Sequence, residues 1–274
     1  SYTSTTNLNH LVVCDKNTLI VETSKQLWAN LINFVPLNER YVLANGINDA
    51  YRFDLRTYEF LKLQRPSTSI LNATIYNGKV LANTTYGTMS NVAYYNVEDI
   101  LNADENTPIT ATSIEGTTQN KKSNIVVAKD GFAYTVCMID NMHKLVKIDK
   151  SFQTEAIDLS FNTVKPTWST LYFAGLVASP TENALFIPAD DHSIYKYEIG
   201  NTASVSSPFI AAPGGTAKLY GAGVVAHPTN GNIYAIYSNY SETDKYTIVV
   251  YTSQGAKVKE IGCGNIVPQT LIFN

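Results

Sequence analysis

The sequence has little charge and only a small excess of acidic over basic residues. Charged residues make up 16% of the 274 residues, below the roughly 25% of an average globular protein, and the formal net charge is −3. A nucleic-acid binder that works through a basic field is excluded, because no surplus of Lys and Arg exists to displace phosphate counterions. An intrinsically disordered chain is excluded too, since 45% of the residues are apolar and disorder needs low hydrophobicity with high net charge.

Long hydrophobic runs and a leader are also missing. No run of about 18 apolar residues occurs, so no transmembrane helix is expected. Residues 1–9 are polar and lack the basic and apolar regions of a signal peptide. Because the chain does not begin with Met, we expect that a leader has been removed. Low charge with abundant Asn, Thr and Tyr (18 Tyr residues) suits an extracytoplasmic protein, secreted, at the cell surface or in the periplasm.

Cysteine is scarce and irregularly spaced. The chain holds Cys14, Cys137 and Cys263, an odd number without CxxC spacing. A zinc site or a disulfide framework needs closely spaced or paired cysteines, so neither is expected. Each cysteine is interpreted as a small, buried strand residue.

What the sequence does contain is a repeated pattern of short strands. Helical periodicity is nearly absent, and residues 24–34, the best helical candidate, fit a strand equally well. β-branched and aromatic runs recur between turn signals, which is the all-β pattern. The clearest pair starts at Gly175 and Gly223, 48 residues apart, and reads as an apolar strand, a Pro-containing turn and an aromatic strand. A repeat of roughly 40–50 residues with four strands is typical of a β-propeller blade.

The same template extends over the chain and predicts six blades. The second strands are expected at residues 11–14, 41–45, 80–84, 132–137, 184–187 and 232–237. The third strands are expected at residues 18–22, 50–55, 92–97, 144–149, 193–199 and 246–251. The fourth strands are expected at residues 26–32, 59–64, 109–114, 154–159, 208–211 and 257–261. Tight hairpins between first and second strands are favoured by the Asn-Gly and Asp-Gly pairs at 77–78, 130–131 and 230–231.

The two ends of the chain are expected to share one blade. Its first strand is residues 270–273, and its other strands come from residues 11–32. Such pairing would close the ring and remove exposed sheet edges. The sequence therefore predicts a single all-β domain over residues 1–274, a six-bladed β-propeller with four-stranded antiparallel blades, with seven blades as the alternative. The expected core positions are Val13, Leu43, Leu81, Tyr134, Phe186 and Tyr234.

Two segments carry a resemblance to known propeller families. Residues 178–187 and 226–235 share a Pro-containing turn and a following aromatic strand, and both resemble blades of YncE-like and NHL-type β-propellers. With its Asn, Thr and Tyr bias, the chain also resembles uncharacterised surface propeller lipoproteins of gut Bacteroidetes. The resemblance implies a fold and a surface location, and it transfers no catalytic residue.

Candidate binding residues lie on loops that follow the second and fourth strands. Propellers usually bind ligands on this face, and loops on a rigid scaffold often carry function. Asp190, Asp191 and His192 form the densest group of titratable side chains. Asp140, Asn141 and His143 occupy the corresponding loop of the preceding blade. The alternative is that both loops are ordinary solvated turns.

Aromatic loop residues complete the expected binding face. Trp168, Tyr86 and Tyr240 form a platform for a sugar or a peptide, or they cap the ends of blades. His227 ends a first strand and either faces the channel or packs against its own blade. The expected ligand-binding residues are Arg65, Tyr86, Asp140, His143, Trp168, Asp190, Asp191, His192, His227 and Tyr240.

These features favour a non-catalytic binding or scaffold module that recognises a glycan or a protein. One alternative is a metal-assisted hydrolase or lactonase at the channel mouth, using Asp140, His143 and residues 190–192 with a divalent cation. Another is a purely structural interaction domain. No other cofactor is expected, because no P-loop or dinucleotide fingerprint occurs. A serine nucleophile is not expected either, because no Gly-x-Ser-x-Gly motif occurs. We expect a monomer that binds no nucleic acid.

Overall fold

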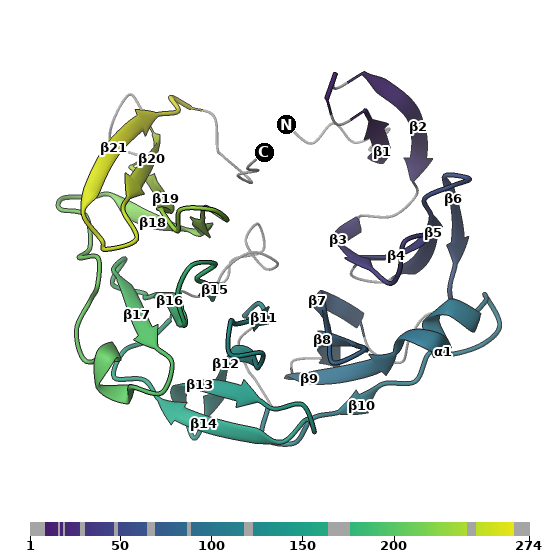
Figure 1. Ribbon diagram of the computed structural model, residues 1–274, viewed down its shortest axis with the longest axis horizontal. Coiled ribbons are helices and arrows are strands. Elements are labelled where there is room, and N and C mark those ends of the chain that lie inside the picture. Colours follow the sequence, from purple (N-terminus) through teal and green to yellow (C-terminus); the bar gives the residue numbers. More distant parts are fainter. Residues whose placement is uncertain are drawn as a thin grey trace. The chain divides into compact units, whose positions relative to one another are not determined.

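The protein folds into antiparallel β-sheets whose strands follow one another in the chain (Figure 1). The computed structural model describes residues 9–15, 17–18, 20–27, 31–46, 49–64, 69–86, 89–117, 123–163, 176–239 and 245–265. Within these ranges, no helix is long and apolar enough to cross a membrane.

Four of the sheets contain four strands each. The first two are formed by β3 (Leu31–Pro36), β4 (Tyr41–Gly46), β5 (Ala50–Asp54) and β6 (Glu59–Lys62), and by β7 (Ser69–Tyr76), β8 (Lys79–Tyr86), β9 (Met89–Asn96) and β10 (Thr112–Ser113). The other two are formed by β11 (Val126–Val127), β12 (Ala133–Ile139), β13 (Met142–Ile148) and β14 (Thr154–Asp158), and by β18 (Lys218–Ala226), β19 (Ile233–Ser238), β20 (Tyr246–Tyr251) and β21 (Lys257–Gly262).

Two smaller sheets complete the described strands. A three-stranded sheet contains β15 (Val177–Ala178), β16 (Ala184–Pro188) and β17 (Ile194–Glu198), and β1 (Asn9–Cys14) pairs with β2 (Val21–Leu27). The chain divides into two compact units, Ser1–Tyr86 with Ala93–Thr112 and Gly87–Val92 with Ser113–Asn274. The first unit therefore contains β1 to β8, the second contains β11 to β21, and the division falls within β9 and β10.

In the second unit, the three-stranded sheet is buried on both faces. Leu185 and Ile187 belong to the core cluster shared with the β11–β14 sheet, whereas Phe186 belongs to the cluster shared with the β18–β21 sheet. Successive strand side chains point to opposite faces, so both faces of β16 are covered. This burial explains why β16 is a continuous apolar run and lacks the alternating pattern of a half-exposed strand.

In the first unit, the core lies between the β3–β6 sheet and the strands that follow it. Leu43 of β4, Val80 of β8 and Tyr95 of β9 are fully buried members of this cluster. The predicted core positions Leu43, Leu81, Tyr134 and Phe186 are confirmed as buried. Tyr234 is half-buried, and the side chain of Val13 lies outside the described part of the chain.

The predicted fourth strand at residues 26–32 is wrong. β2 continues to Leu27, and β3 begins at Leu31 as the first strand of the next sheet, pairing with β4. Residues 26–32 therefore include the end of β2 and the start of β3, and they do not form one strand. The predicted fourth strand at residues 208–211 is reduced to a single bridge between Ile194 and Ile210.

The helix α1 (Val97–Asn102), the longer coiled ribbon in Figure 1, was not predicted. Residues 92–97 were expected as a strand, whereas β9 starts at Met89 and the chain turns into α1 after Asn96. Glu98 and Asp99 in the first turn, with Val97 and Ile100 three residues apart, are the local helix signal. Six residues are too few for a helical period to stand out from a strand pattern.

A distant arginine holds the end of α1. Arg52 Nη1 of β5 donates hydrogen bonds to the backbone carbonyls of Leu101 and Ala103, the latter at 3.2 Å. A helix leaves its last carbonyls without partners inside the helix, and α1 has no basic residue in its own last turn. The β3–β6 sheet therefore supplies the cap that the helix sequence lacks.

Asparagine side chains join neighbouring sheets within each unit. In the first unit, Asn33 Nδ2 donates to Ala73 O at 2.8 Å. In the second, Asn124 Nδ2 donates to Leu176 O at 2.6 Å, and Leu176 N donates to Asn124 Oδ1 at 2.6 Å. Asn33 and Asn124 hold equivalent positions in their sheets. Asn33 lies two residues before Val35, which pairs with Leu43 of β4, and Asn124 lies two residues before Val126, which pairs with Tyr134 of β12. The repeat thus carries a polar link between sheets as well as an apolar core.

We expect Asn124→Ala to lower the free energy of unfolding by about 2–4 kcal/mol, because the buried Leu176 would lose partners for both its N–H and its C=O. Urea unfolding followed by circular dichroism measures the loss. The matched control is Asn183→Ala, which removes an exposed Asn from the same unit and should change stability by less than about 0.5 kcal/mol. Equal stabilities of the two variants would refute this role.

Candidate functional site

Two turns predicted as binding loops lie together in the second unit. The segment at residues 160–163 runs between them, and Thr163 forms an antiparallel bridge with Ala189. Asp190 N donates to Asn162 O at 2.9 Å. On its other side, Thr163 N donates to His143 Nδ1 at 2.8 Å, and the Thr163 hydroxyl lies 2.8 Å from the same nitrogen. These contacts join the β12–β13 turn to the β16–β17 turn.

The exposed residues of these segments form what we call the joined-turn surface. Its members are Asp140, Asn141, Met142, Ser160, Asn162, Asp190 and Asp191. Three of them carry carboxylates, two carry amides, and the Met142 side chain is 50% exposed. The surface therefore offers hydrogen-bond acceptors and donors together with one exposed apolar side chain.

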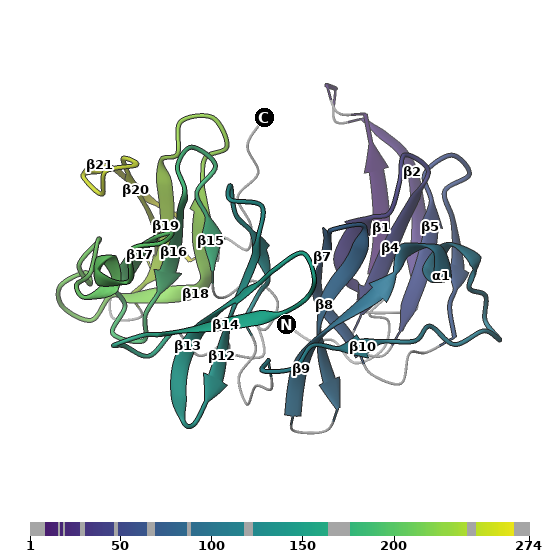
Figure 2. The same ribbon diagram turned by 60° about the horizontal axis from the view of Figure 1, so that its bottom comes forward.

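The β12–β13 turn is shorter than the sequence predicted. Met138 and His143 were expected in a loop, but they are strand partners, and only Asp140 and Asn141 connect the strands. Figure 2 shows β12 and β13 as neighbouring strands. Both residues have positive φ, 53° and 61°, which a two-residue hairpin of this kind requires and which Asp and Asn tolerate. The two-residue turn fixes the backbone positions of Asp140 and Met142.

His143 is a buried residue, not an exposed loop residue. Its side chain belongs to β13 and is 3% exposed. Since its Nδ1 accepts the Thr163 amide hydrogen, this nitrogen positions the 160–163 segment. The strand pairing explains the difference from the prediction, because it turns residue 143 toward the interior.

The β16–β17 turn is held by its own side chains and backbone. Asp191 Oδ1 accepts hydrogen bonds from Ser193 N at 2.9 Å and Ser193 Oγ at 2.5 Å. Ala189 N donates to Ser193 O, and His192 N donates to Ala189 O. Asp190 is exposed, so within this turn Asp190 presents a carboxylate to solvent while Asp191 also stabilises the backbone.

His192 occupies a strained and partly desolvated position. Its φ is 72°, and its Nδ1 is buried without a hydrogen-bond partner among the described residues. Burial lowers the pKa of His192 below its ordinary value of 6.5, and the charge of Lys218 lowers it further, against the opposing effects of Asp191 and Asp190. The imidazole is therefore favoured in its neutral form.

The described residues contain no group of three or more His, Cys, Asp or Glu side chains placed to hold a metal ion. His227, on the β18–β19 turn, accepts a hydrogen bond from Thr229 N at 3.2 Å and stacks on Tyr234, so it packs against its own blade. Arg65, Trp168 and Tyr240 lie outside the described residues, as does the side chain of Tyr86.

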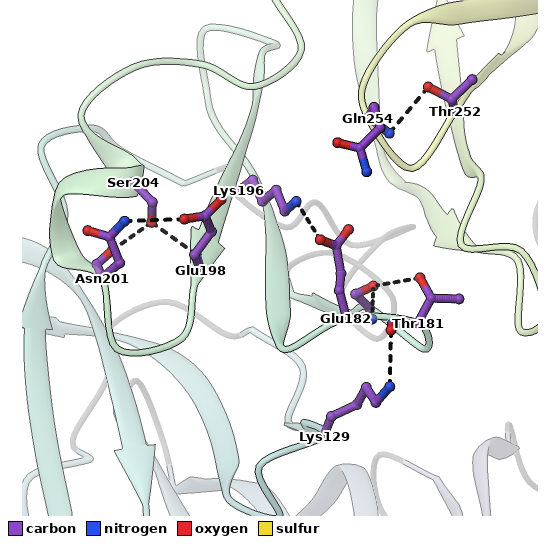
Figure 3. Close-up of polar contacts among 10 residues, drawn as sticks. Lys129, Thr181, Glu182, Lys196, Glu198, Asn201, Ser204, Thr252 and Gln254 are labelled. Atoms are coloured by element: carbon purple, nitrogen blue, oxygen red, sulfur yellow. Dashed lines mark hydrogen bonds and ion pairs between the residues drawn. The ribbon is translucent and has the colours of Figure 1, made fainter.

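A second polar cluster, which the sequence analysis missed, lies at the β15–β16 turn (Figure 3). Lys196 Nζ and Glu182 Oε2 form an ion pair at 2.6 Å, and Lys129 Nζ donates to Thr181 O at 3.0 Å. Lys196 is 8% exposed, and a buried lysine is stable only when it is paired. The signal in the sequence is a lysine between two tyrosines in the middle of strand β17. This cluster fastens the turn to β17, at the opposite end of β16 from the joined-turn surface.

Comparisons with known proteins agree on the fold. The family model described as "Domain of unknown function (DUF5074)" matches residues 2–274. A quinonprotein alcohol dehydrogenase-like protein from Bacteroides thetaiotaomicron is 35% identical, with a TM-score of 0.84, over 96% of this chain and 62% of that chain. The chain therefore spans less than two thirds of that protein's length. No curated protein matches.

More distant solved structures share the fold alone. Virginiamycin B lyase from Staphylococcus aureus is 12% identical, with a TM-score of 0.54, over 93% of this chain and 73% of that chain. A chain of a nidogen/laminin complex is 12% identical, with a TM-score of 0.56, over 92% and 89% of the two chains. Together the likenesses indicate a β-propeller-type fold.

We expect the stability of the protein to depend on pH through His192. Because its pKa is below 6.5 in the folded state, the unfolded chain binds a proton there more readily. The free energy of unfolding therefore falls as the pH drops below about 6.5. Urea midpoints at about pH 7.5 and pH 5 should differ less in His192→Asn, since Asn keeps a residue that tolerates positive φ. An unchanged pH dependence in this variant would contradict the assignment.

We expect His143→Ala to loosen the joined-turn surface. Removing the acceptor of the Thr163 amide should speed hydrogen exchange at Thr163 and Asp190 by about tenfold. Amide exchange followed by NMR measures this change. His227→Ala is the matched control, because it removes a histidine acceptor from a different turn. If both variants exchange alike at Thr163, His143 does not hold the segment.

Proposed function

The chain belongs to the DUF5074 family, and we propose that it is a non-catalytic binding module that recognises a protein or glycan through its loops. The joined-turn surface carries this proposal. Three chain segments far apart in the sequence are fixed to one another there by the contacts of Thr163 and Asp190. A surface that is ordered before binding loses less conformational entropy when a ligand arrives.

The chemistry of this surface suits polar ligands. Asp140 and Asp190 are exposed acceptors for sugar hydroxyls or for the cationic side chains of a protein, and the exposed side chain of Met142 offers an apolar contact. Sites that combine a few fixed polar groups with apolar area are typical of ligand recognition. The predicted contributions of Arg65, Tyr86, Trp168 and Tyr240 would extend the same face.

The wider setting of the module is also a proposal. We infer a single six-bladed propeller over residues 1–274, closed by its N- and C-terminal strands and related to YncE-like and NHL-type propellers. Successive sheets of consecutive strands support this inference. We further infer a monomer at a bacterial cell surface or in the periplasm, carried there as a secreted protein or lipoprotein, and the likeness to a Bacteroides protein supports a bacterial origin.

The experiment compares binding of the labelled protein to a glycan array and to immobilised Bacteroides envelope proteins. We expect Asp140→Asn with Asp190→Asn to weaken the strongest interaction by at least about tenfold, because two hydrogen-bond acceptors become neutral. The control, Glu115→Gln with Glu155→Gln, removes two exposed carboxylates elsewhere in the second unit and should bind as the natural protein does. Equal binding by both double variants would rule out this surface.

Metal analysis and thermal melts with Ca²⁺, Mg²⁺ and Zn²⁺ test the hydrolase or lactonase alternative. For a binding module without a metal, we expect no stoichiometric ion and no rise in melting temperature with ion concentration. A rise that follows mass action and disappears in Asp140→Asn and Asp190→Asn would replace the proposal with a metal-dependent activity.

A further inference from the structure

Two histidines flank the 160–163 segment of the joined-turn surface. His143 of β13 is 3% exposed, and its Nδ1 accepts the amide hydrogen of Thr163 at 2.8 Å. A histidine nitrogen accepts a hydrogen bond only while it carries no proton. A proton on this nitrogen would point at the N–H of Thr163, so the contact exists only with Nδ1 unprotonated.

His192 lies on the other side of the segment, in the β16–β17 turn. This turn holds the segment through Asp190 N, which donates to Asn162 O, and through the bridge between Ala189 and Thr163. His192 N donates to Ala189 O at 3.0 Å, and His192 Nδ1 is buried without a hydrogen-bond partner among the described residues. A charged imidazole carries a proton on both nitrogens. In His192 one of them would be a buried donor without an acceptor, which is costly.

The charges around His192 do not offset this cost. Burial is the largest effect and lowers the pKa of His192 below 6.5. The positive charge of Lys218 on β18 lowers the pKa further, whereas the carboxylates of Asp191 and Asp190 in its own turn raise it. The net effect favours the neutral imidazole in the folded turn.

The residues that meet His143 from neighbouring elements carry no charge. They are Met138, opposite it on β12, Leu159, which donates to its carbonyl, and Thr163. The ion pair between Lys144 and Asp158, at 3.0 Å, begins at the next residue of β13, whose side chain points to the other face of the sheet. None of these groups stabilises a charged imidazole at residue 143.

We propose that the joined-turn surface is a proton-sensitive switch, in which protonation of His143 or His192 releases the 160–163 segment from the turn on that side. This regulation rests on the proposed function, because the release affects recognition only if the surface binds a ligand. A histidine of ordinary pKa that binds its proton only in the released state increases the released population about thirtyfold at pH 5 and hardly changes it at pH 7.5. The surface is therefore ordered at neutral pH and opens in mild acid.

Hydrogen-exchange protection factors, measured by NMR, follow the switch without a ligand. We expect the factors of the Thr163 and Asp190 amides to fall at least about tenfold between about pH 7.5 and pH 5. The amide of Ser179, which donates to Ala184 O at the opposite end of β16, should keep its protection. An equal fall at Ser179 would indicate unfolding of the whole sheet and would overturn the local switch.

Two variants separate the histidines. His143→Asn keeps an uncharged acceptor near the position of Nδ1 and should preserve the protection of Thr163 at low pH. His192→Asn keeps a residue that tolerates positive φ and should preserve the protection of Asp190. The control, His227→Asn, removes a histidine from the β18–β19 turn and should respond to pH as the natural protein does. No fall in the natural protein, or the same fall in all three variants, would overturn the proposal.

The consequence for binding is measured on the glycan array and the immobilised envelope proteins at both pH values. We expect the strongest interaction of the natural protein to weaken at least about tenfold at the lower pH, and that of the double variant, His143→Asn with His192→Asn, to stay unchanged. Undiminished binding by the natural protein would overturn the regulatory role. Absence of binding at neutral pH counts against the proposed function alone, since the exchange measurement still decides whether the switch exists.

Discussion

The architecture depends on the burial of sheet faces against neighbouring sheets. β16 shows the constraint most clearly, because Leu185 and Phe186 are adjacent in the chain and enter two different cores. A sheet of three or four short strands cannot bury its own faces, so each must be covered by another sheet. The side chains of Asn33 and Asn124 add hydrogen bonds between neighbouring segments to this packing. Core and links together make the strands a rigid frame.

Because the strands form the core, the joined-turn surface and the polar cluster at the β15–β16 turn lie mainly at the turns between strands. In the second unit, the two ends of β16 make different kinds of polar contact. One end is fastened by the ion pair between the buried Lys196 and the half-buried Glu182, and the other contributes Asp190 to the joined-turn surface. The ion pair holds a turn to its neighbouring strand, whereas the joined-turn surface exposes carboxylates on a backbone fixed by His143 and Thr163. Buried polar groups position the backbone, and the exposed polar groups are those that the proposed binding function would use.

Similarity in fold leaves the function to be argued from side chains. The chain shares its fold with a lyase and with a chain of a nidogen/laminin complex at 12% identity, and one propeller scaffold supports many unrelated functions. The 35% identical Bacteroides protein is considerably longer than this chain. The proposed function therefore rests on this chain's own turns and on the exposed carboxylates of Asp140 and Asp190.

The sequence by itself determined the all-β class, most strand positions and buried residues such as Leu43 and Phe186, because alternation, β-branched runs and Asn-Gly turns report geometry within a few residues. Only the tertiary structure decided that His143 is buried, that Thr163 joins two turns and that α1 forms with Arg52 at its end. Arg52 lies about fifty residues before the carbonyls it caps, and Thr163 follows His143 by 20 residues. Such contacts depend on how the sheets pack in space, and a pattern within a few residues does not predict which distant residue a side chain will contact.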